Sequence, residues 1–332
     1  MIRRRDVPAL VMPLLSGCGA RSERRVSIAL APGLLEVYLT HLARQLGHFR
    51  DEGLDVSLDE LTGSRQLESL LAGSSDAVYT SFSTILYLAV EERAVRSFFV
   101  GMEALSAMLV ASARSAARLQ RVEDLRGATV GVSGFGTAQP NTLEIILSRH
   151  GLAMADVTLI AYGSGPSAVA ALQYGKVDAG VINGSAFSVL KRRVPNVRIL
   201  VDPRTREGTR ELTGAERYAN YCLISTPAWL GRHSELARKL TKAMLRTLHW
   251  VHAHQPEELR EHLPAAVRSD DAEADLESLR ILIQGTSKDG RMSPKVPEDM
   301  RRYIAVSNQK VRNAKFDLAS TYTNQFLDEV SR

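Results

Sequence analysis

The chain has 332 residues, of which 45% are hydrophobic and 24% are charged, and its formal net charge is +5. This length suits two domains, each with an ample hydrophobic core. The positive charge is small and evenly spread, with no basic patch interleaved with aromatic residues, which argues against nucleic-acid binding. The longest apolar stretch, from Phe98 to Ala113, is too short for a membrane span and contains Glu103.

The N-terminal residues predict an export signal. Three arginines, Arg3 to Arg5, precede an apolar segment at 7–15. Leu15-Ser16-Gly17-Cys18 resembles the lipobox of bacterial lipoproteins. The resemblance implies that residues 1–17 are a signal peptide, that Cys18 carries a lipid, and that 18–25 tether the protein to the membrane. A secretory signal cleaved after Ala20 and a twin-arginine signal are the alternatives.

One stretch of the sequence occurs twice. Residues 64–81 and 166–183 each predict a short helix, a glycine stop, a tight turn and a buried strand that ends in a small polar residue. Asp76 of the first copy corresponds to Asp178 of the second, a constant offset of 102 residues. Two sheet edges with matching polar ends indicate two lobes that face each other across a cleft.

The repeat extends upstream. In the first half, a strand and glycine loop at 26–33 lead into a helix with leucines at helical spacing and then a strand at 54–61. In the second half, a strand and glycine loop at 128–136 lead into a helix around Leu143 and a strand at 156–162. Each half is therefore β-α-β-α-β, which predicts an α/β fold whose two lobes are mostly parallel sheets flanked by helices. Two α/β units without a shared site are the alternative.

The order of elements implies two crossings between the lobes. We expect lobe 1 to comprise residues 26–111 and 223–332, and lobe 2 to comprise residues 112–222. A strand at 221–225 would return the chain to lobe 1 through a double hinge. The C-terminal third is predicted to be helical, with helices at 229–254, 276–285, 297–311 and 322–330.

Glycine-rich or polar loops follow the strands of both halves, at the end where open α/β sheets bind ligands. The loop at 133–137 presents N–H groups at a helix start, which stabilises an anion, and the loop at 62–64 matches it. Four aromatic residues, Phe82, Phe135, Phe187 and Tyr38, are candidates for stacking on a planar ligand, although Phe187 fits a core position better. A structural glycine turn is the alternative for each loop. The candidate ligand-binding residues are Pro32, Gly33, Tyr38, Gly63, Ser64, Ser81, Phe82, Ser83, Ser133, Gly134, Phe135, Gly136, Thr137, Asn183 and Gly184.

Residue types that serve catalysis occur, but not in productive sets. Asp76 and Asp178 lie at the starts of their strands, which favours a turn or capping role. Cys222 lies in an apolar strand and is expected to be a small buried hydrophobe. The histidines between 249 and 262 have no cysteine or carboxylate to complete a metal set, and no serine, histidine and aspartate form a triad. We therefore expect a protein that is not an enzyme and has no metal or cofactor.

Four stretches resemble the substrate-binding proteins of bacterial ABC importers for nitrate, sulfonates, taurine and thiamine-pyrimidine precursors. They are residues 47–56, 70–77, 124–132 and 220–229. The resemblance implies a type II periplasmic binding fold, in which two lobes joined by a two-strand hinge close on a solute. It also implies an exported, membrane-tethered monomer that delivers a small-molecule solute to an ABC permease, with ligand loops at the candidate residues.

The chemistry of the solute stays open at this point. The candidate loops hold no lysine or arginine apart from the neighbouring Arg65, so an anion would rest on N–H groups and hydroxyls alone. Sulfonates, oxyanions and neutral heterocycles all remain possible ligands. The alternatives in function are a sensor for a membrane receptor and an enzyme of the pyrimidine-synthase branch. The chain departs from that branch because it lacks its cysteine-rich metal segment.

Overall fold

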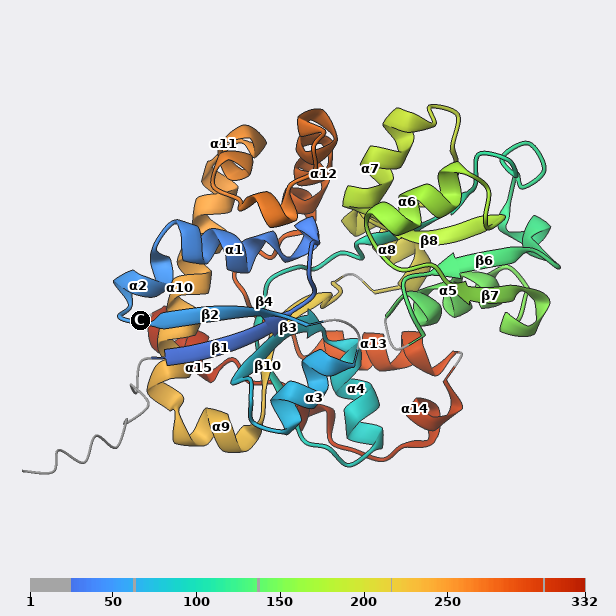
Figure 1. Ribbon diagram of the computed structural model, residues 1–332. Coiled ribbons are helices and arrows are strands. Elements are labelled where there is room, and N and C mark those ends of the chain that lie inside the picture. The colour runs from blue at the N-terminus through green and yellow to red at the C-terminus, as the bar shows by residue number, and fades with distance from the viewer. Residues whose placement is uncertain (1–24, 62–63, 136–137, 216, 307, 332) are drawn as a thin grey trace, which may run out of the picture.

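The computed structural model describes residues 25–61, 64–135, 138–215, 217–306 and 308–331. Its strands form two sheets, each at the centre of one of two lobes that lie side by side (Figure 1). Helices flank both sheets, which confirms the predicted α/β class. The strands are β1 (Arg25–Leu30), β2 (Asp55–Glu60), β3 (Ala77–Ser81), β4 (Arg96–Val100), β5 (Ala107–Ala111), β6 (Thr129–Val132), β7 (Thr158–Ala161), β8 (Ala179–Asn183), β9 (Arg198–Val201) and β10 (Tyr221–Ser225).

Some helices precede β10 and lie among the strands, and those after β10 belong to the C-terminal third. The α-helices are α1 (Tyr38–Gln45), α2 (His48–Asp51), α3 (Arg65–Leu71), α4 (Ser83–Val90), α5 (Ala138–Arg149), α6 (Pro166–Gln173), α7 (Gly184–Arg193), α8 (Arg206–Thr213), α9 (Pro227–Arg232), α10 (Ser234–Ala253), α11 (Pro256–Glu261), α12 (Ala272–Gly285), α13 (Lys295–Ala305), α14 (Gln309–Asn313) and α15 (Gln325–Val330). Short 3-10 helices are η1 (Leu35–Val37), η2 (Val122–Leu125), η3 (Met154–Asp156), η4 (Ala265–Val267) and η5 (Leu318–Thr321).

The two sheets repeat one another strand by strand. The order is β2-β1-β3-β10-β4 in the first lobe and β7-β6-β8-β5-β9 in the second. In each sheet the first three strands are parallel and the fourth, β10 or β5, is antiparallel to both of its neighbours. Ile28 pairs with Ala77, and Val130 pairs with Ala179. These pairs are related by the same offset as the sequence repeat, so the duplication extends to strand register.

The two repeated aspartates make the same contact in each lobe. Asp76 accepts a hydrogen bond from the backbone N–H of Ser27 at 2.9 Å, and Asp178 accepts one from that of Thr129 at 2.9 Å. Each carboxylate thus fastens the start of β3 or β8 to the neighbouring strand. The structural role predicted for both residues is confirmed, because these contacts lie at the strand starts rather than at the ends where ligands bind.

The chain crosses between the lobes after β4 and returns before β10. β5 pairs with β8 and β9 in the second sheet, whereas β10 pairs with β3 and β4 in the first. The expected lobe limits therefore shift: residue 111 ends a strand of the second sheet, and residue 223 lies inside a strand of the first. Residues 98–111 form one mostly apolar stretch, so hydrophobicity alone does not show where the chain changes sheet.

The two crossing segments are hydrogen-bonded to each other. The N–H groups of Gly101 and Met102 donate to the Tyr221 carbonyl at 2.7 and 3.2 Å, and the Asn220 N–H donates to the Met102 carbonyl at 2.9 Å. A Cβ atom at Gly101 would lie 2.0 Å from the Tyr79 hydroxyl, so this position requires glycine for close approach. The crossing segments thus form a paired hinge at the centre of the molecule.

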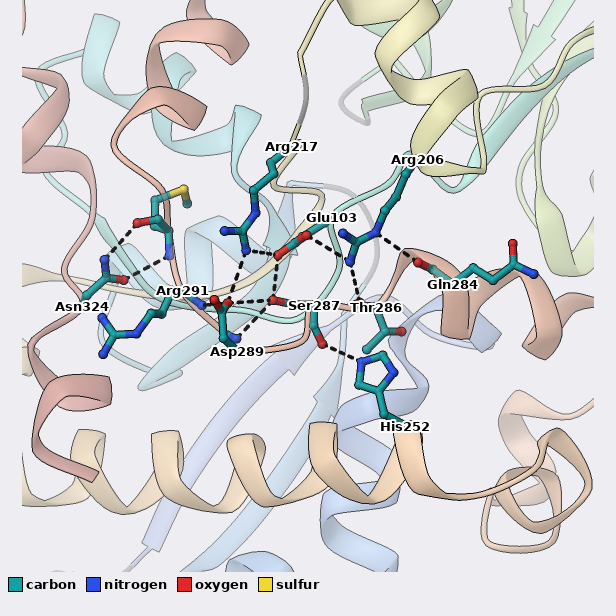
Figure 2. A network of polar contacts seen from close by, with 12 residues as sticks. Glu103, Arg206, Arg217, His252, Gln284, Thr286, Ser287, Asp289, Arg291 and Asn324 are labelled. Atoms are coloured by element: carbon teal, nitrogen blue, oxygen red, sulfur yellow. Dashed lines mark hydrogen bonds and ion pairs between the residues drawn. The ribbon is translucent and has the colours of Figure 1, made fainter. Parts of the chain in front are cut away.

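A buried carboxylate stands at this hinge. The side chain of Glu103 is 3% exposed and forms ion pairs with Arg217 and, at 3.2 Å, with Arg206. The Ser287 hydroxyl donates to the same carboxylate at 2.8 Å. Figure 2 shows the two arginines reaching Glu103 while Ser287 approaches it from the segment after α12. The hydrogen bond to Glu103 raises the pKa of Arg217, so this guanidinium stays charged.

The C-terminal helices contact both lobes. In the first lobe α12 contacts η1, and in the second it packs against α7, where the Ser278 hydroxyl donates to that of Ser188 at 2.9 Å. Lys191 of α7 pairs with Glu277 of α12 at 2.9 Å. On the opposite side, α13 contacts α4 of the first lobe and α5 and α8 of the second (Figure 1). These helices hold the lobes together on two sides.

One hydrophobic cluster continues from lobe to lobe. It includes Val78 and Val100 of the first sheet, Leu109 and Val130 of the second, and Met300 of α13. All five side chains are at most 2% exposed. The lobes are therefore packed against each other on the α13 side, and separating them there would expose apolar surface.

Two of the predicted C-terminal helices are divided. The helix expected at 229–254 is interrupted at His233, between α9 and α10, after Gly231 has weakened the helix propensity. The helix expected at 297–311 is divided into α13 and α14, because the Asn308 side chain accepts the Val311 N–H at 3.0 Å and starts a new helix. Within the described ranges, no helix combines the length and apolar character that a membrane span needs.

Replacing Glu103 with alanine should lower the free energy of unfolding by about 1–3 kcal/mol, because Arg206 and Arg217 lose a charged acceptor. Both guanidiniums are partly exposed and regain hydration, so the full cost of a broken buried ion pair is not expected. Urea unfolding followed by circular dichroism measures the change, with Glu261→Ala at an exposed position as the control. An unfolding midpoint shared by both variants would contradict this role of Glu103.

Candidate functional site

The junction between the lobes carries a hydrogen-bonded contact that neither lobe makes alone. Glu36 lies in η1, after the glycine loop that follows β1, and its side chain is fully buried. Ser185 lies at the start of α7, directly after β8. The Ser185 N–H donates to the Glu36 carboxylate at 3.2 Å and its hydroxyl donates at 3.0 Å. A carboxylate of lobe 1 thus occupies the positive end of a helix dipole in lobe 2.

Burial dominates the electrostatics of Glu36. Desolvation raises the pKa of this carboxyl group, and hydrogen bonds from Ser185 and Asn183 offset the rise only in part. Across the described ranges, no lysine or arginine forms an ion pair with Glu36. The hydrogen bonds that Glu36 accepts within these ranges therefore come from neutral donors alone.

A chain of amide contacts extends from Glu36 into the second lobe. The Gln139 side chain of α5 donates to the Asn183 side-chain oxygen at 2.6 Å and accepts the Ser133 N–H at 2.7 Å. The Asn183 side-chain oxygen accepts from Gln139. The NH2 group of Asn183 is therefore directed at other acceptors, which include Glu36. Ser133, Gln139 and Asn183 are thereby held in fixed orientations at the ends of β6 and β8.

The strand ends of the first lobe reach the same junction through the hinge. Ser81 pairs with Tyr221, whose hydroxyl lies near Ser106 and Glu36. The carbonyl of Ser106 in turn accepts the Gly184 N–H at 2.9 Å. Ser81 and the start of α7 are therefore connected through Tyr221 and Ser106. Polar ends of both sheets lie at one junction, as the predicted cleft between two lobes requires.

The arginines that border this junction already have carboxylate partners. Arg204 is 8% exposed and donates two hydrogen bonds of 2.8 Å to Asp202. Arg206 and Arg217 pair with Glu103. These three arginines are thus paired with Asp202 or Glu103. Within the described part of the chain, Glu36 has no lysine or arginine as an ion-pair partner.

A small cavity opens between α12 and the start of α7. Its volume is about 10 Å³, which is room for roughly one water molecule. Its walls include Ser106, Gly184, Ser185 and Arg204. This cavity holds nothing larger than a water molecule, and a larger solute would need the lobes to move apart at the hinge.

The structure brings only part of the predicted site together. Ser81, Ser83, Ser133, Asn183 and Gly184 lie at strand ends or helix starts, and the Ser81 and Ser83 hydroxyls are 2.9 Å apart. Pro32 and Gly134 are half-buried, whereas Gly33 and Ser64 are exposed. Gly63, Gly136 and Thr137 lie outside the described residues, as does Cys18.

The aromatic candidates are placed differently from one another. Phe82 is 0% exposed in the cluster shared by the lobes, and Tyr38 is 1% exposed and hydrogen-bonded to Thr286. Phe187 lies in the core of lobe 2, as expected. Phe135 is 67% exposed. Of these rings, only Phe135 is free to meet a ligand without repacking.

Sequence reasoning missed Glu36, Gln139 and Ser106. Glu36 interrupts the apolar run from Leu34 to Val37, directly after a glycine loop. An acidic residue in such a run, at the end of a strand, was the available signal. Gln139 and Ser106 carried no comparable signal, because their roles arise from contacts between distant segments.

Cys222 and the C-terminal histidines, which we did not expect to serve catalysis or metal binding, make packing and stacking contacts in the described part of the chain. Cys222 is buried, and desolvation raises the pKa of its thiol to about 12. Among the described histidines, cysteines and acidic residues, no group of three or more is placed to hold a metal ion. The Trp250 ring stacks on His254 and His262, with centroids 4.1 and 5.4 Å away.

Solved structures with the same architecture are numerous. A protein from Bordetella bronchiseptica RB50 aligns with a TM-score of 0.86 at 27% identity, over 93% of this chain and 97% of its own. The periplasmic aliphatic sulphonate binding protein SsuA from Escherichia coli aligns with a TM-score of 0.60 at 19% identity, over 90% and 91%. The periplasmic nitrate-binding protein NrtA from Synechocystis PCC 6803 aligns with a TM-score of 0.65 at 12% identity, over 93% and 88%. These likenesses confirm the periplasmic-binding-protein fold.

A search among curated proteins gives no match. The model of a protein family described as NMT1/THI5 like, by contrast, matches residues 37–258, well over half of the chain. The matched region contains the first repeated half from α1 onward, the whole second half, both hinge crossings, Asn183 and Ser185. The chain therefore belongs to the NMT1/THI5-like family.

Proposed function

We propose that this protein is the extracytoplasmic solute-binding component of an ABC importer and captures a small solute between its two lobes. The observation that carries the proposal is the meeting of both lobes at Glu36, Asn183 and Ser185, where each sheet presents its strand ends. Family membership and the fold shared with the SsuA and NrtA proteins support the same function. These neighbours are named for binding solutes, which supports a role other than catalysis.

Solute capture would proceed by motion at the hinge. The crossing segments hold the lobes together through a few backbone hydrogen bonds, so they can rotate while both sheets stay intact. The contacts that must break on opening are those between Glu36 and Ser185 and those between α12 and α7. A solute then replaces them with its own hydrogen bonds and draws the lobes together again.

Export and membrane attachment complete the proposal. Cys18 would carry a lipid and hold the protein, as a monomer, at the membrane face where an ABC permease receives the solute. The lipobox-like Leu15-Ser16-Gly17-Cys18 sequence supports this attachment. Residues 18–25 would serve as the tether.

A bound solute should raise the melting temperature of the purified full chain, because a ligand that binds only the folded state stabilises it. Differential scanning fluorimetry with sulfonates, oxyanions, amines and small heterocycles measures the shift. Titration calorimetry on the best compound should give a single site per chain. If no compound in any of these classes raises the melting temperature, the solute-binding function is contradicted.

Asn183→Ala should weaken the binding of that solute by about 1–3 kcal/mol, because a buried amide partner is lost and Gln139 is left without its acceptor. Asn313→Ala, at an exposed position on α14, is the matched control and should bind with wild-type affinity. Titration calorimetry of both variants measures the difference. Equal affinities would remove Asn183 from the site.

Cys18→Ser should release the protein from the membrane, because a serine hydroxyl cannot take the thioether-linked lipid. Metabolic labelling with a radioactive fatty acid, followed by fractionation of the producing cells, distinguishes the two forms. The natural chain should carry label in the membrane fraction, and the variant should carry none. Label retained by the variant would contradict a lipid on Cys18.

A further inference from the structure

The α7 N-terminus, the most suitable place for an anion at the junction, is already occupied by the protein's own carboxylate. Both Glu36 oxygens accept hydrogen bonds from Ser185, at 3.0 and 3.2 Å, at the second position of a ten-residue helix. A sulfonate or nitrate at this position would have to expel Glu36. It would also have to remain beside a negative charge in a setting of low dielectric constant.

The neighbouring cations do not offset that charge. Arg204 is bound by both oxygens of Asp202, and Arg206 and Arg217 share Glu103. Each of these arginines thus contacts a carboxylate other than Glu36, and Glu36 accepts hydrogen bonds from neutral donors alone among the described residues. At this position the protein offers hydrogen-bond acceptors rather than cations.

Glu36 has acceptor capacity beyond its present contacts. An ionised carboxylate offers about four lone-pair positions, whereas Ser185 supplies one N–H and one hydroxyl hydrogen. A third contact comes from Asn183. When the lobes open, the two Ser185 donors are withdrawn, and Glu36 stays on the lobe 1 side of the cleft as an acceptor without a cation.

We propose that Glu36 is the specificity-determining residue of the cleft and that the solute is a small molecule which presents N–H donors on an amine, amidine or guanidine group, rather than a sulfonate, sulfate or nitrate. This inference rests on the proposed solute-binding function. The N–H donors of the solute bind the Glu36 carboxylate directly in a site shielded from water, where charge-assisted hydrogen bonds are strong. The same carboxylate excludes anions by like-charge repulsion.

Three forms of the full chain separate these effects: wild type, Glu36→Gln and Glu36→Ala. Propylamine, benzamidine, agmatine and 4-aminopyridine serve as donor probes, and ethanesulfonate, nitrate and sulfate serve as anion probes. We expect at least one donor probe to bind the wild type and to bind E36Q about 10- to 100-fold more weakly, since a neutral amide replaces a charged acceptor. Titration calorimetry and thermal shift measure both. Glu261→Gln, which removes an exposed charge, is the control and should match the wild type.

The anion probes give the complementary result. The wild type should bind none of them, whereas E36A, in which the α7 N-terminus is vacated, should gain affinity for at least one. E36Q should gain little, because its side chain still fills the position. A further readout needs no ligand: E36Q should melt at a higher temperature than the wild type at neutral pH, because burial raises the pKa of the Glu36 carboxyl group and a group with a raised pKa lowers stability above its unfolded pKa.

The outcomes also separate this inference from the proposed function. If the wild type binds an anion probe as tightly as E36A does, solute binding stands and the role of Glu36 is overturned. If the donor probes all fail, or if they bind wild type and E36Q equally, the assigned solute class is overturned. If neither donor nor anion probes bind any of the three forms, the solute-binding function itself is contradicted.

Discussion

The paired crossing segments at the hinge constrain the rest of the molecule. The hydrogen bonds among Gly101, Met102, Asn220 and Tyr221 place the antiparallel strand of each sheet at a fixed distance from the other sheet. Because β10 lies beside β3 and β5 lies beside β8, the carboxyl ends of the parallel strands are directed to one junction. Residue 101 must be glycine, because a Cβ atom there would collide with the Tyr79 hydroxyl.

Two buried carboxylates with opposite surroundings lie near this hinge. Glu103 is surrounded by Arg206, Arg217 and a serine hydroxyl, so its charge is matched and the contact serves to fix the segments (Figure 2). Glu36 has only neutral donors, and burial raises its pKa. A buried carboxylate with ion-pair partners suits a structural role. A buried carboxylate without such partners lowers stability, so its presence indicates a functional requirement. Glu103 fixes the crossing segments, whereas Glu36 is the carboxylate that we propose contacts the solute.

The packing between the lobes also restricts how they can move. Their hydrophobic clusters are continuous through Val78, Leu109 and Met300, and α12 and α13 contact both lobes on opposite sides. A rotation that separates α7 from α12 breaks hydroxyl contacts and ion pairs but little apolar packing. A rotation that separates α13 from α5 and α8 would expose the shared cluster at greater cost. The hinge is therefore expected to open on the α7 and α12 side.

The sequence by itself determined the repeat, the α/β class and the role of the two aspartates. These features depend on local patterns: strand and helix periodicity, glycine stops and an offset that strand register preserves. It also placed Ser81 and Asn183 at strand ends, because a polar residue that closes an apolar strand can be recognised without coordinates; their contact with a ligand stays a prediction. The division of the chain between the sheets was less accurate, since most of β4 and all of β5 lie in one mostly apolar stretch at 98–111 and hydrophobicity does not mark the change of sheet.

Only the tertiary structure decided what lies opposite those strand ends. Glu36 and Ser185 are 149 residues apart, and their contact follows from the way the hinge sets one sheet against the other. Phe82 and Tyr38 likewise proved to be packed in the interior because both lobes and the C-terminal helices close over them. Local patterns specify which elements form and which end of a strand is polar. The environment of a buried charge depends on residues from both lobes, and no window of sequence contains them together.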